Sequence, residues 1–326
     1  MKYLFVRILE KCNARCDMCC YGGNYDGYVF SGHEWIALLD SALYQGIQCI
    51  RLTGGEPLIH PNILAIVTSA AERGLRVSVI TNGYKLESLM DTLVDAGLSQ
   101  VIVSIDSPDP TEHDMLRGIK GLYKRALSGL KAAKAAGLHT RVNTVCGPRN
   151  FRSMPTLQVL LTELGIDQWE LSTLKLERKL DYASTDRAAM EMVTHLVYTA
   201  GPSAGKLRPM GKSWWGETDL ERTAYLEYGV APQPTTYCHI VNQVRYLDPS
   251  ARRLYPCSLL PHRPNSVSLS VEVGDWGILP LSSPAMMSIA NRLAKTGFLR
   301  CTGCSATAAG YVPAAISCDS SFVWDY

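Results

Sequence analysis

The sequence lacks the features that would place this chain in a membrane or outside the cell. No apolar run reaches the roughly 18 residues that a membrane-spanning helix needs. Residues 3–9 already read as a strand, with neither the charged region nor the cleavage site of a signal peptide before them. We therefore expect a cytoplasmic protein with no membrane partner.

An excess of charge and low-complexity sequence are also missing. The 326 residues carry 32 Lys and Arg against 30 Asp and Glu, and these give a formal net charge of +2 with no basic block. A nucleic-acid partner is therefore not expected. No low-complexity tract is present, and the one repeated unit is a strand followed by a helix. The chain is long enough for one large domain or one and a half.

Cysteine, by contrast, is plentiful. Eleven cysteines without a secretion signal indicate metal ligation in a reducing compartment, not a disulfide scaffold. Cys12, Cys16 and Cys19 fall close together, and such a group binds a metal, forms a disulfide or stays as inert thiols. Structural zinc usually takes paired C-x-x-C motifs. Three thiolates suit a [4Fe–4S] cluster that keeps one iron for a non-protein ligand.

Alternating apolar strands and amphipathic helices run through the first half of the chain. Strands are expected at 3–9, 49–53, 76–80, 101–105, 140–145 and 168–174, and helices at 31–44, 61–73, 86–96, 122–136 and 154–164. With a further helix expected at 179–197, these six β-then-α repeats predict an α/β fold, a parallel sheet curved into a partial (β/α)6 barrel. In such barrels the chemistry lies where the strands end.

Glycine and polar residues stand at the ends of the second, third and fourth strands. They are the stretch Thr53–Pro57, then Asn82, and then Ser104 and Asp106. In this order, behind a C-x-x-x-C-x-x-C motif, they resemble the radical S-adenosylmethionine (SAM) superfamily over roughly the first 175 residues. Met18 departs from the family pattern, which usually has an aromatic residue there, and Cys20 is read as a bystander.

The resemblance implies two cofactors. A [4Fe–4S] cluster would be held by Cys12, Cys16 and Cys19, with its open iron chelated by SAM. Glu56 would hold the methionine ammonium of SAM. The full set of implied SAM-binding residues is Gly54, Gly55, Glu56, Asn82, Ser104 and Asp106.

A second cysteine set lies in the last third of the chain. A hairpin that turns at residues 248–250 would bring Cys238 and Cys257 together, while Cys301 and Cys304 form a knuckle. On spacing alone, zinc and an iron–sulfur cluster both remain open. The order and gaps resemble the twitch domain of some radical SAM enzymes, although the family's glycine before the second cysteine is missing. This resemblance implies a fully protein-ligated auxiliary [4Fe–4S] cluster that transfers electrons.

These patterns predict three parts: a radical SAM partial barrel over 1–178, a connecting helical and loop region over 179–234, and a cysteine-rich α+β twitch-like domain over 235–326. Trp214 and Trp215 either cover a substrate or pack at the domain junction. Cys318 lies too far from the knuckle to extend it.

The implied chemistry begins with a 5′-deoxyadenosyl radical that takes hydrogen from an unactivated carbon. An external electron donor such as flavodoxin or ferredoxin is implied. The opening stretch 3–14, with the Tyr- and Asp-containing loop after it and Phe30-Ser31, resembles cytosylglucuronate decarboxylases of nucleoside-antibiotic pathways over about the first 60 residues. This resemblance implies a sugar-acid nucleoside and loss of carbon dioxide. Arg141 and Lys175, on the fifth and sixth strands, are candidates at the barrel mouth for binding the carboxylate. Alternatively, Arg141 binds the SAM carboxylate, and Lys175 or Arg178 is only a solvated charge at the end of a strand.

Three alternatives stay open. A twitch-type dehydrogenase of an aminocyclitol or sugar alcohol would use the same two clusters. A peptide-modifying enzyme usually carries a leader-binding domain before the barrel, whereas Met1 leads directly into the first strand. A metal-binding interaction protein is the non-enzyme alternative if SAM does not bind.

Overall fold

The structure is a computed structural model, and it describes residues 2–16, 18–19, 26–147, 149–173, 209–211, 240–258, 260–262 and 266–296. Its strands form one ten-stranded sheet in the order β10-β9-β8-β1-β2-β3-β4-β5-β6-β7. The strands are β1 Tyr3–Leu9, β2 Cys49–Gly54, β3 Arg76–Thr81, β4 Leu98–Ser104, β5 His139–Cys146, β6 Gln168–Thr173, β7 Pro209–Gly211, β8 Val244–Asp248, β9 Arg253–Tyr255 and β10 Val271–Glu272.

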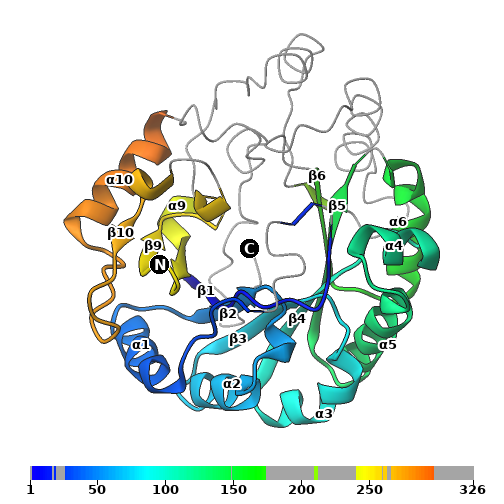
Figure 1. Cartoon of the computed structure of the whole chain (residues 1–326), viewed down its shortest axis with the longest axis horizontal. Coiled ribbons are helices and arrows are strands. Elements are labelled where there is room, and N and C mark those ends of the chain that lie inside the picture. The colour runs from blue at the N-terminus through cyan, green and yellow to red at the C-terminus, as the bar shows by residue number, and fades with distance from the viewer. Residues whose placement is uncertain are drawn as a thin grey trace, which may run out of the picture.

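Strands β1 to β6 are parallel neighbours in chain order, which confirms the predicted partial barrel. Their helices lie along the outer, convex side of the curved sheet (Figure 1). These helices are α1 Gly32–Tyr44, α2 Ile63–Ala71, α3 Leu86–Asp95, α4 Pro110–Arg117, α5 Leu122–Ala135 and α6 Met154–Glu163, and two more, α9 Ile240–Gln243 and α10 Pro284–Thr296, come later in the chain. Within the described ranges, none of them has the length and apolarity needed to cross a bilayer.

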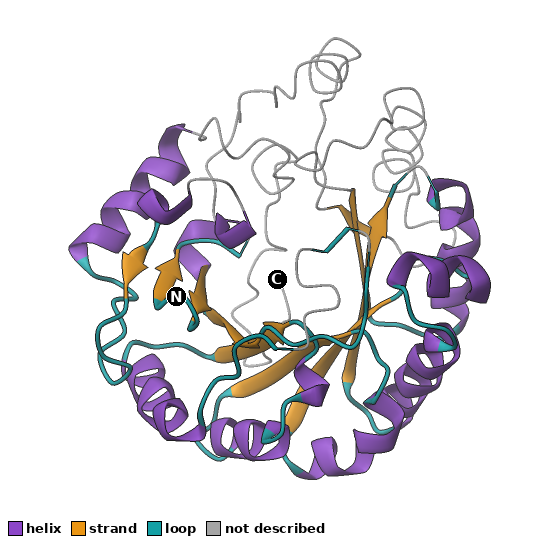
Figure 2. Ribbon diagram, viewed as in Figure 1, coloured by secondary structure: helices purple, strands orange, loops and turns teal. Residues whose placement is uncertain are grey.

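The outer face of the sheet carries the main core. Val101 and Val103 of β4, and Ile105 just after it, are fully buried in one cluster with apolar residues of the helices. Because side chains alternate across a strand, Gln100, Ile102 and Ser104 face the inside of the barrel. Figure 2 shows the helices on one side of the strands and the concave side free of described helices over β2 to β4.

Polar side chains line the inside of the barrel near the N-terminal ends of its strands. Arg51 donates from Nε to Ser78 Oγ at 2.9 Å and from Nη2 to Gln100 Oε1 at 3.0 Å. Gln100 in turn contacts His139 at 3.0 Å between Nε2 and Nδ1. The Arg51 guanidinium also lies 5.1 Å from the centre of the Phe5 ring. A buried charge supported in this way can form the floor of a barrel without a large loss of stability.

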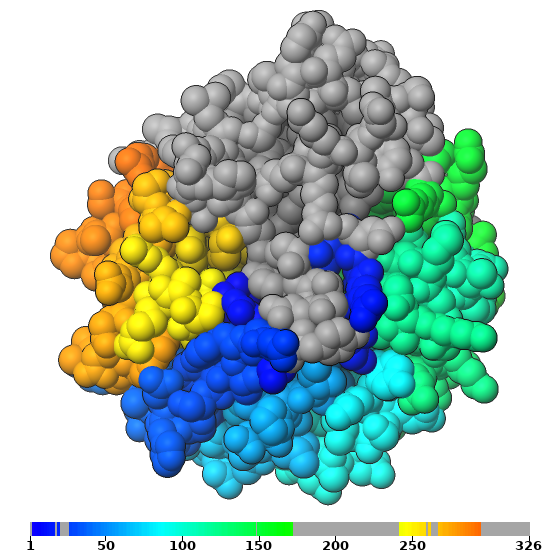
Figure 3. All heavy atoms as spheres, viewed as in Figure 1, coloured from blue at the N-terminus to red at the C-terminus, as the bar shows by residue number. Residues whose placement is uncertain are grey.

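The predicted hairpin is present, and it continues the barrel sheet. Strand β8 runs parallel to β1, with Tyr3 opposite Val244, and β9 returns antiparallel to β8. Helix α9 occupies residues 240–243, directly before β8. In the space-filling view the atoms of 240–296 lie against those of the N-terminal elements (Figure 3). The expected domain boundaries at 178 and 235 fall outside the described residues and remain predictions.

Candidate functional site

Gly54 and Gly55 make room for the segment that leads to the first cysteine. A Cβ on Gly54, whose φ is 148°, would lie 2.1 Å from the carbonyl oxygen of Leu9, and one on Gly55 would lie 2.1 Å from that of Lys11. Gly55 N–H donates to the Leu9 oxygen at 2.9 Å. The observed close approach is therefore between two backbone segments of the protein. The expected contact of these glycines with SAM stays a prediction.

Glu56 ties the end of β2 to the end of β3. Its carboxylate is 1% exposed, and it accepts hydrogen bonds from Thr81 Oγ1 at 2.6 Å, Asn82 N at 2.7 Å and Leu58 N at 3.0 Å. Burial raises the pKa of Glu56, while these three donors act in the opposite direction. A carboxylate offers about four lone-pair sites. The three donors leave about one lone-pair site on the carboxylate. That site is enough for the predicted hydrogen bond from the SAM ammonium.

Asn82 joins the loop after β3 to the cysteine loop. Its Nδ2 donates to Asn13 Oδ1 at 2.8 Å, and its Oδ1 accepts from Tyr84 N at 2.9 Å. Asn13 stands directly after Cys12, so the bond positions the start of the cysteine motif. Ser104, which was predicted to contact SAM, is half-buried at the end of β4 and faces the inside of the barrel.

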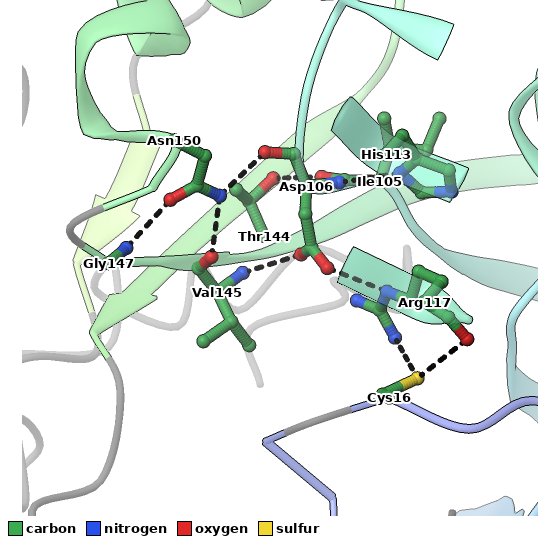
Figure 4. Close-up of polar contacts among 9 residues, drawn as sticks. All are labelled: Cys16, Ile105, Asp106, His113, Arg117, Thr144, Val145, Gly147 and Asn150. Carbon is green, nitrogen blue, oxygen red and sulfur yellow. Dashed lines mark hydrogen bonds and ion pairs between the residues drawn. The ribbon is translucent and has the colours of Figure 1, made fainter. Parts of the chain in front are cut away.

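Asp106 is engaged on every side by the protein itself, as Figure 4 shows. Its side chain is fully buried, with Oδ2 accepting from Arg117 Nε at 2.6 Å and Oδ1 accepting from Val145 N at 2.9 Å. Its backbone N–H donates to His113 Nδ1 at 3.1 Å, and its carbonyl accepts from Asn150 Nδ2 at 2.7 Å. Asp106 therefore anchors the loop after β4, and its expected bond to SAM stays a prediction.

The three motif cysteines gather at one place. Cys12 and Cys16 are buried in a small cluster against which Cys19 and Met18 pack. Burial raises the pKa of the Cys12 thiol to about 12 and also raises that of Cys16, where Arg117 acts in the opposite direction. Among the described residues, no three His, Cys, Asp or Glu side chains are close enough to hold a metal ion as they stand.

The chemistry of this donor set nevertheless fits an iron–sulfur cluster. Cys12 and Cys16 are buried together with Cys19 packed against them, and a metal deprotonates a coordinating thiol outright. The cysteine loop follows β1 and lies beside the ends of β2 and β3, because Leu9 and Lys11 are bonded to Gly55 and Glu56 after β2, and Asn13 is bonded to Asn82 after β3. This is the edge of a parallel barrel at which cofactor chemistry is expected.

Arg141 does not lie at the barrel mouth, contrary to expectation. It is the third residue of β5, opposite Ile102 of β4, and only 1% of it is exposed. It forms an ion pair with Glu170 of β6, and its Nε donates to Asn143 Oδ1 at 3.0 Å. A single sequence does not show that the neighbouring strand supplies a buried carboxylate, and for this reason Arg141 was taken as a candidate for binding a substrate or SAM carboxylate.

The remaining sequence-predicted residues divide in two. Cys257 is described: it follows β9 and is buried in the second apolar cluster, with Tyr255 and Tyr246. The others lie outside the described residues: Lys175, Arg178, Cys20, Cys238, Cys301, Cys304, Cys318 and the pair Trp214–Trp215.

Helix α4 supplies two residues that the sequence reasoning missed, His113 and Arg117. They stand four positions apart and so share one face of the helix, which packs on Asp106. The helix had usable signals. Asp109 caps its N-terminus by accepting from Glu112 N at 2.8 Å, Pro110 is its first residue, and Gly118 ends it with a φ of 65°.

Known proteins resemble this chain in sequence, mainly over its N-terminal half. Residues 6–158 match the profile of the radical SAM superfamily. The GTP 3′,8-cyclase of Microcystis aeruginosa is 32% identical over 157 residues, 45% of this chain and 48% of that protein. The AdoMet-dependent heme synthase of Nitratidesulfovibrio vulgaris is 26% identical over 176 residues, 53% of this chain and 48% of that protein. This chain thus spans about half the length of these curated relatives.

Solved structures share the architecture. Native anSMEcpe with bound AdoMet has a TM-score of 0.66 and 14% identity, covering 93% of this chain and 89% of its own. Streptococcus suis SuiB bound to S-adenosylmethionine has a TM-score of 0.64 and 16% identity, covering 93% and 72%. Together with the cysteine loop after β1 and the strand-end residues, the family match shows that residues 6–158 form a radical SAM domain, whose cofactors are SAM and a [4Fe–4S] cluster.

Proposed function

We propose that this chain is a radical SAM enzyme that removes a hydrogen atom from a sugar or sugar-nucleoside substrate. The observation that carries the proposal is the convergence of Cys12, Cys16 and Cys19 beside the ends of β2 and β3. When bound, SAM and the cluster supply a 5′-deoxyadenosyl radical. This step needs no general acid or base, and the task of the protein is positioning and exclusion of water.

The chain's own residues provide that positioning. The Asn13–Asn82 bond and the bonds of Gly55 and Glu56 to residues 9–11 fix the cysteine loop on the strand ends. The remaining acceptor capacity of Glu56 suits a substrate or cofactor ammonium. Below them, Ser104 and Asn143 stand opposite one another on β4 and β5 and face inward. Polar groups of this kind suit a hydroxyl-rich ligand.

For the reaction, we favour decarboxylation of a cytosylglucuronate-like sugar acid. The support is the resemblance of the opening stretch to such enzymes, and a nucleotide-acting relative is named among the cyclases. Lys175 is the carboxylate-binding candidate on this proposal. After loss of carbon dioxide the substrate radical must gain one electron and one proton. Each turnover then consumes about two reducing equivalents, drawn from a donor such as flavodoxin or ferredoxin.

One observation favours a second candidate, dehydrogenation of a sugar alcohol or aminocyclitol. Arg141 is ion-paired with Glu170, so its charge is already compensated by the protein and is less suited to a substrate carboxylate. An uncharged substrate would need no such residue. In this reaction the substrate radical gives up its electron, and an auxiliary cluster is the acceptor we propose.

The auxiliary cluster is itself a proposal. It assigns Cys238, Cys257, Cys301 and Cys304 as ligands of a second [4Fe–4S] cluster, and only Cys257 among them lies in the described residues. Reconstituted protein should then hold about eight irons and eight sulfides per chain. Tightly bound zinc in protein purified without air, with iron confined to about four per chain, would contradict it.

An anaerobic reaction with SAM, reductant and candidate sugar nucleosides separates the two reactions. The decarboxylase proposal predicts one carbon dioxide and one 5′-deoxyadenosine per product, with solvent deuterium in the product. A loss of two hydrogens without carbon dioxide would overturn it and support the dehydrogenase. Formation of 5′-deoxyadenosine with neither outcome would reject both substrate proposals.

A further inference from the structure

Arg117 lies between a buried carboxylate and a motif cysteine. Its Nε donates to Asp106 at 2.6 Å, and its Nη1 lies 4.0 Å from Cys16 Sγ (Figure 4). The Arg117 side chain is 12% exposed, and that of Asp106 is fully buried. The carboxylate therefore holds the guanidinium in a fixed orientation in which one of its edges faces the sulfur.

The backbone fixes the same geometry from a second direction. Arg15 N donates to the Arg117 carbonyl at 3.1 Å, which fastens the end of α4 to the cysteine loop. Gly118 follows in the left-handed conformation, and a Cβ there would lie 2.8 Å from the Arg15 carbonyl. The helix end thus abuts the loop directly. Neither Arg117 nor Cys16 can move away from the other without breaking these contacts.

Ligation changes the character of the contact between the two residues. The Cys16 thiol contacts the Arg117 carbonyl oxygen at 3.7 Å, and this contact needs the S–H proton. Once Cys16 is a thiolate that proton is gone, and the oxygen is no longer an acceptor for it. The Nη1 donor of the guanidinium cation then faces an anionic sulfur, so both partners of the contact carry a charge.

We propose that Arg117, oriented by Asp106, is a positioning residue that donates a hydrogen bond to the Cys16 thiolate and raises the reduction potential of the bound cluster. This inference rests on the proposed cluster at Cys12, Cys16 and Cys19. Hydrogen bonds to the sulfurs and the net charge near them set the potential of an iron–sulfur cluster. A cation at the sulfur stabilises the reduced, more negative cluster over the oxidised one.

Three arginine variants test the proposal in reconstituted full-length protein. Arg117→Gln removes the charge, Arg117→Lys keeps it, and Arg73→Gln is the matched control. Arg73 also pairs with an aspartate, Asp40, at 2.9 Å, but it lies on the helical side of the barrel. Iron content is measured first, and the midpoint potential follows from an electron paramagnetic resonance titration without SAM. The signal that changes when SAM is added identifies the cluster in question.

The expected result is a more negative midpoint in Arg117→Gln, partial recovery in Arg117→Lys, and the wild-type value in Arg73→Gln. An unchanged midpoint in an Arg117→Gln protein that retains its iron would overturn the inference. A wild-type protein that forms no SAM-responsive cluster would instead reject the proposed function on which the inference rests.

A measurement on the unaltered Arg117 covers the case in which Arg117→Gln does not fold. The protein is labelled with guanidino-15N arginine and carries Arg15→Lys, which removes the neighbouring guanidinium. A weak hyperfine coupling is expected between the 15N nuclei of Arg117 and the electron spin of the reduced cluster. The absence of that coupling in a fully loaded cluster would overturn the inference independently of any loss of folding.

Discussion

The side-chain amide of Asn82 donates a 2.8 Å hydrogen bond to the side-chain oxygen of Asn13. This single bond connects the loop after β3 to the residue that follows the first motif cysteine. The backbone of Asn82 is held at the same time by Glu56, through a bond of 2.7 Å. The ends of strands β2 and β3 therefore position the cysteine loop through the side chains of Glu56, Asn82 and Asn13.

Replacing Asn13 by alanine should loosen the cluster without unfolding the barrel. The lost hydrogen bond is worth about 1 kcal/mol, which corresponds to a roughly fivefold faster loss of iron. The measurement is the rate of iron transfer to a chelator under anaerobic conditions. Asn62→Ala is the control, since Asn62 is exposed and its side chain makes no capping bond to α2. Equal rates in the two variants would mean that the Asn13 bond does not position the loop.

Gly55→Ala should disrupt the cysteine loop even though the change is a single methyl group. The added Cβ would lie 2.1 Å from the Lys11 carbonyl oxygen, so the segment before Cys12 must shift. A forced backbone shift of this kind costs roughly 1–3 kcal/mol, and the iron content should fall with it. Gly32→Ala is matched, because no atom lies within 4 Å of a Cβ at that position. Full iron loading and wild-type stability of Gly55→Ala would refute the described path of the loop.

The free energy of unfolding should depend on pH through His113. Burial lowers the pKa of this fully buried imidazole from 6.5 to about 4. Between pH 4 and 6.5 the histidine is protonated in the unfolded chain but not in the folded protein. The free energy of unfolding therefore rises with pH over this range, and the folded protein loses stability as the pH falls below 6.5. One such group contributes up to about 1.4 kcal/mol per pH unit.

Denaturation at pH values from 7.5 to 5.5 checks this expectation. His113→Gln keeps an acceptor for the Asp106 N–H but cannot take up a proton, so its stability should fall less steeply with acid. His33→Gln changes an exposed histidine and should follow the wild-type curve. Parallel curves for all three proteins would show that His113 does not contribute.

Arg141→Met should affect stability more than substrate binding. It leaves the Glu170 carboxylate buried at 7% exposure without its cationic partner, a change that costs about 3–5 kcal/mol. Arg141→Met with Glu170→Leu should recover most of that loss, because both charges are then removed. Chemical denaturation of the two variants and of Lys175→Ala gives the comparison. If Arg141→Met were as stable as wild type but raised the KM for a carboxylate substrate, the original assignment of Arg141 would be restored.

The barrel was predictable because its signals are local. Short apolar strands alternate with amphipathic helices, and glycines such as Gly74, Gly97 and Gly137 follow helices with a positive φ, as helix-ending glycines do. The cysteine loop and the glycine pair were predictable for the same reason. The purpose of the glycines was not, since their neighbour is a backbone segment more than forty positions earlier in the chain.

What the sequence could not show are pairings between distant segments. Helix α4 is short and polar, so it has little periodicity, and its importance comes from Asp106 and Cys16 on other elements. The parallel pairing of β8 with β1 joins residues far apart in the chain. Arg141 belongs to the same group of errors, because its burial depends on a carboxylate supplied by another strand.

The most direct test of the central claim is the anaerobic formation of 5′-deoxyadenosine from SAM by the reconstituted chain. Wild-type protein with reductant should produce it, whereas a variant with Cys12, Cys16 and Cys19 all replaced by alanine should produce none and should keep about half of roughly eight irons. Wild-type protein that is fully loaded with iron yet leaves SAM intact, or a triple variant that still cleaves SAM, would contradict the account.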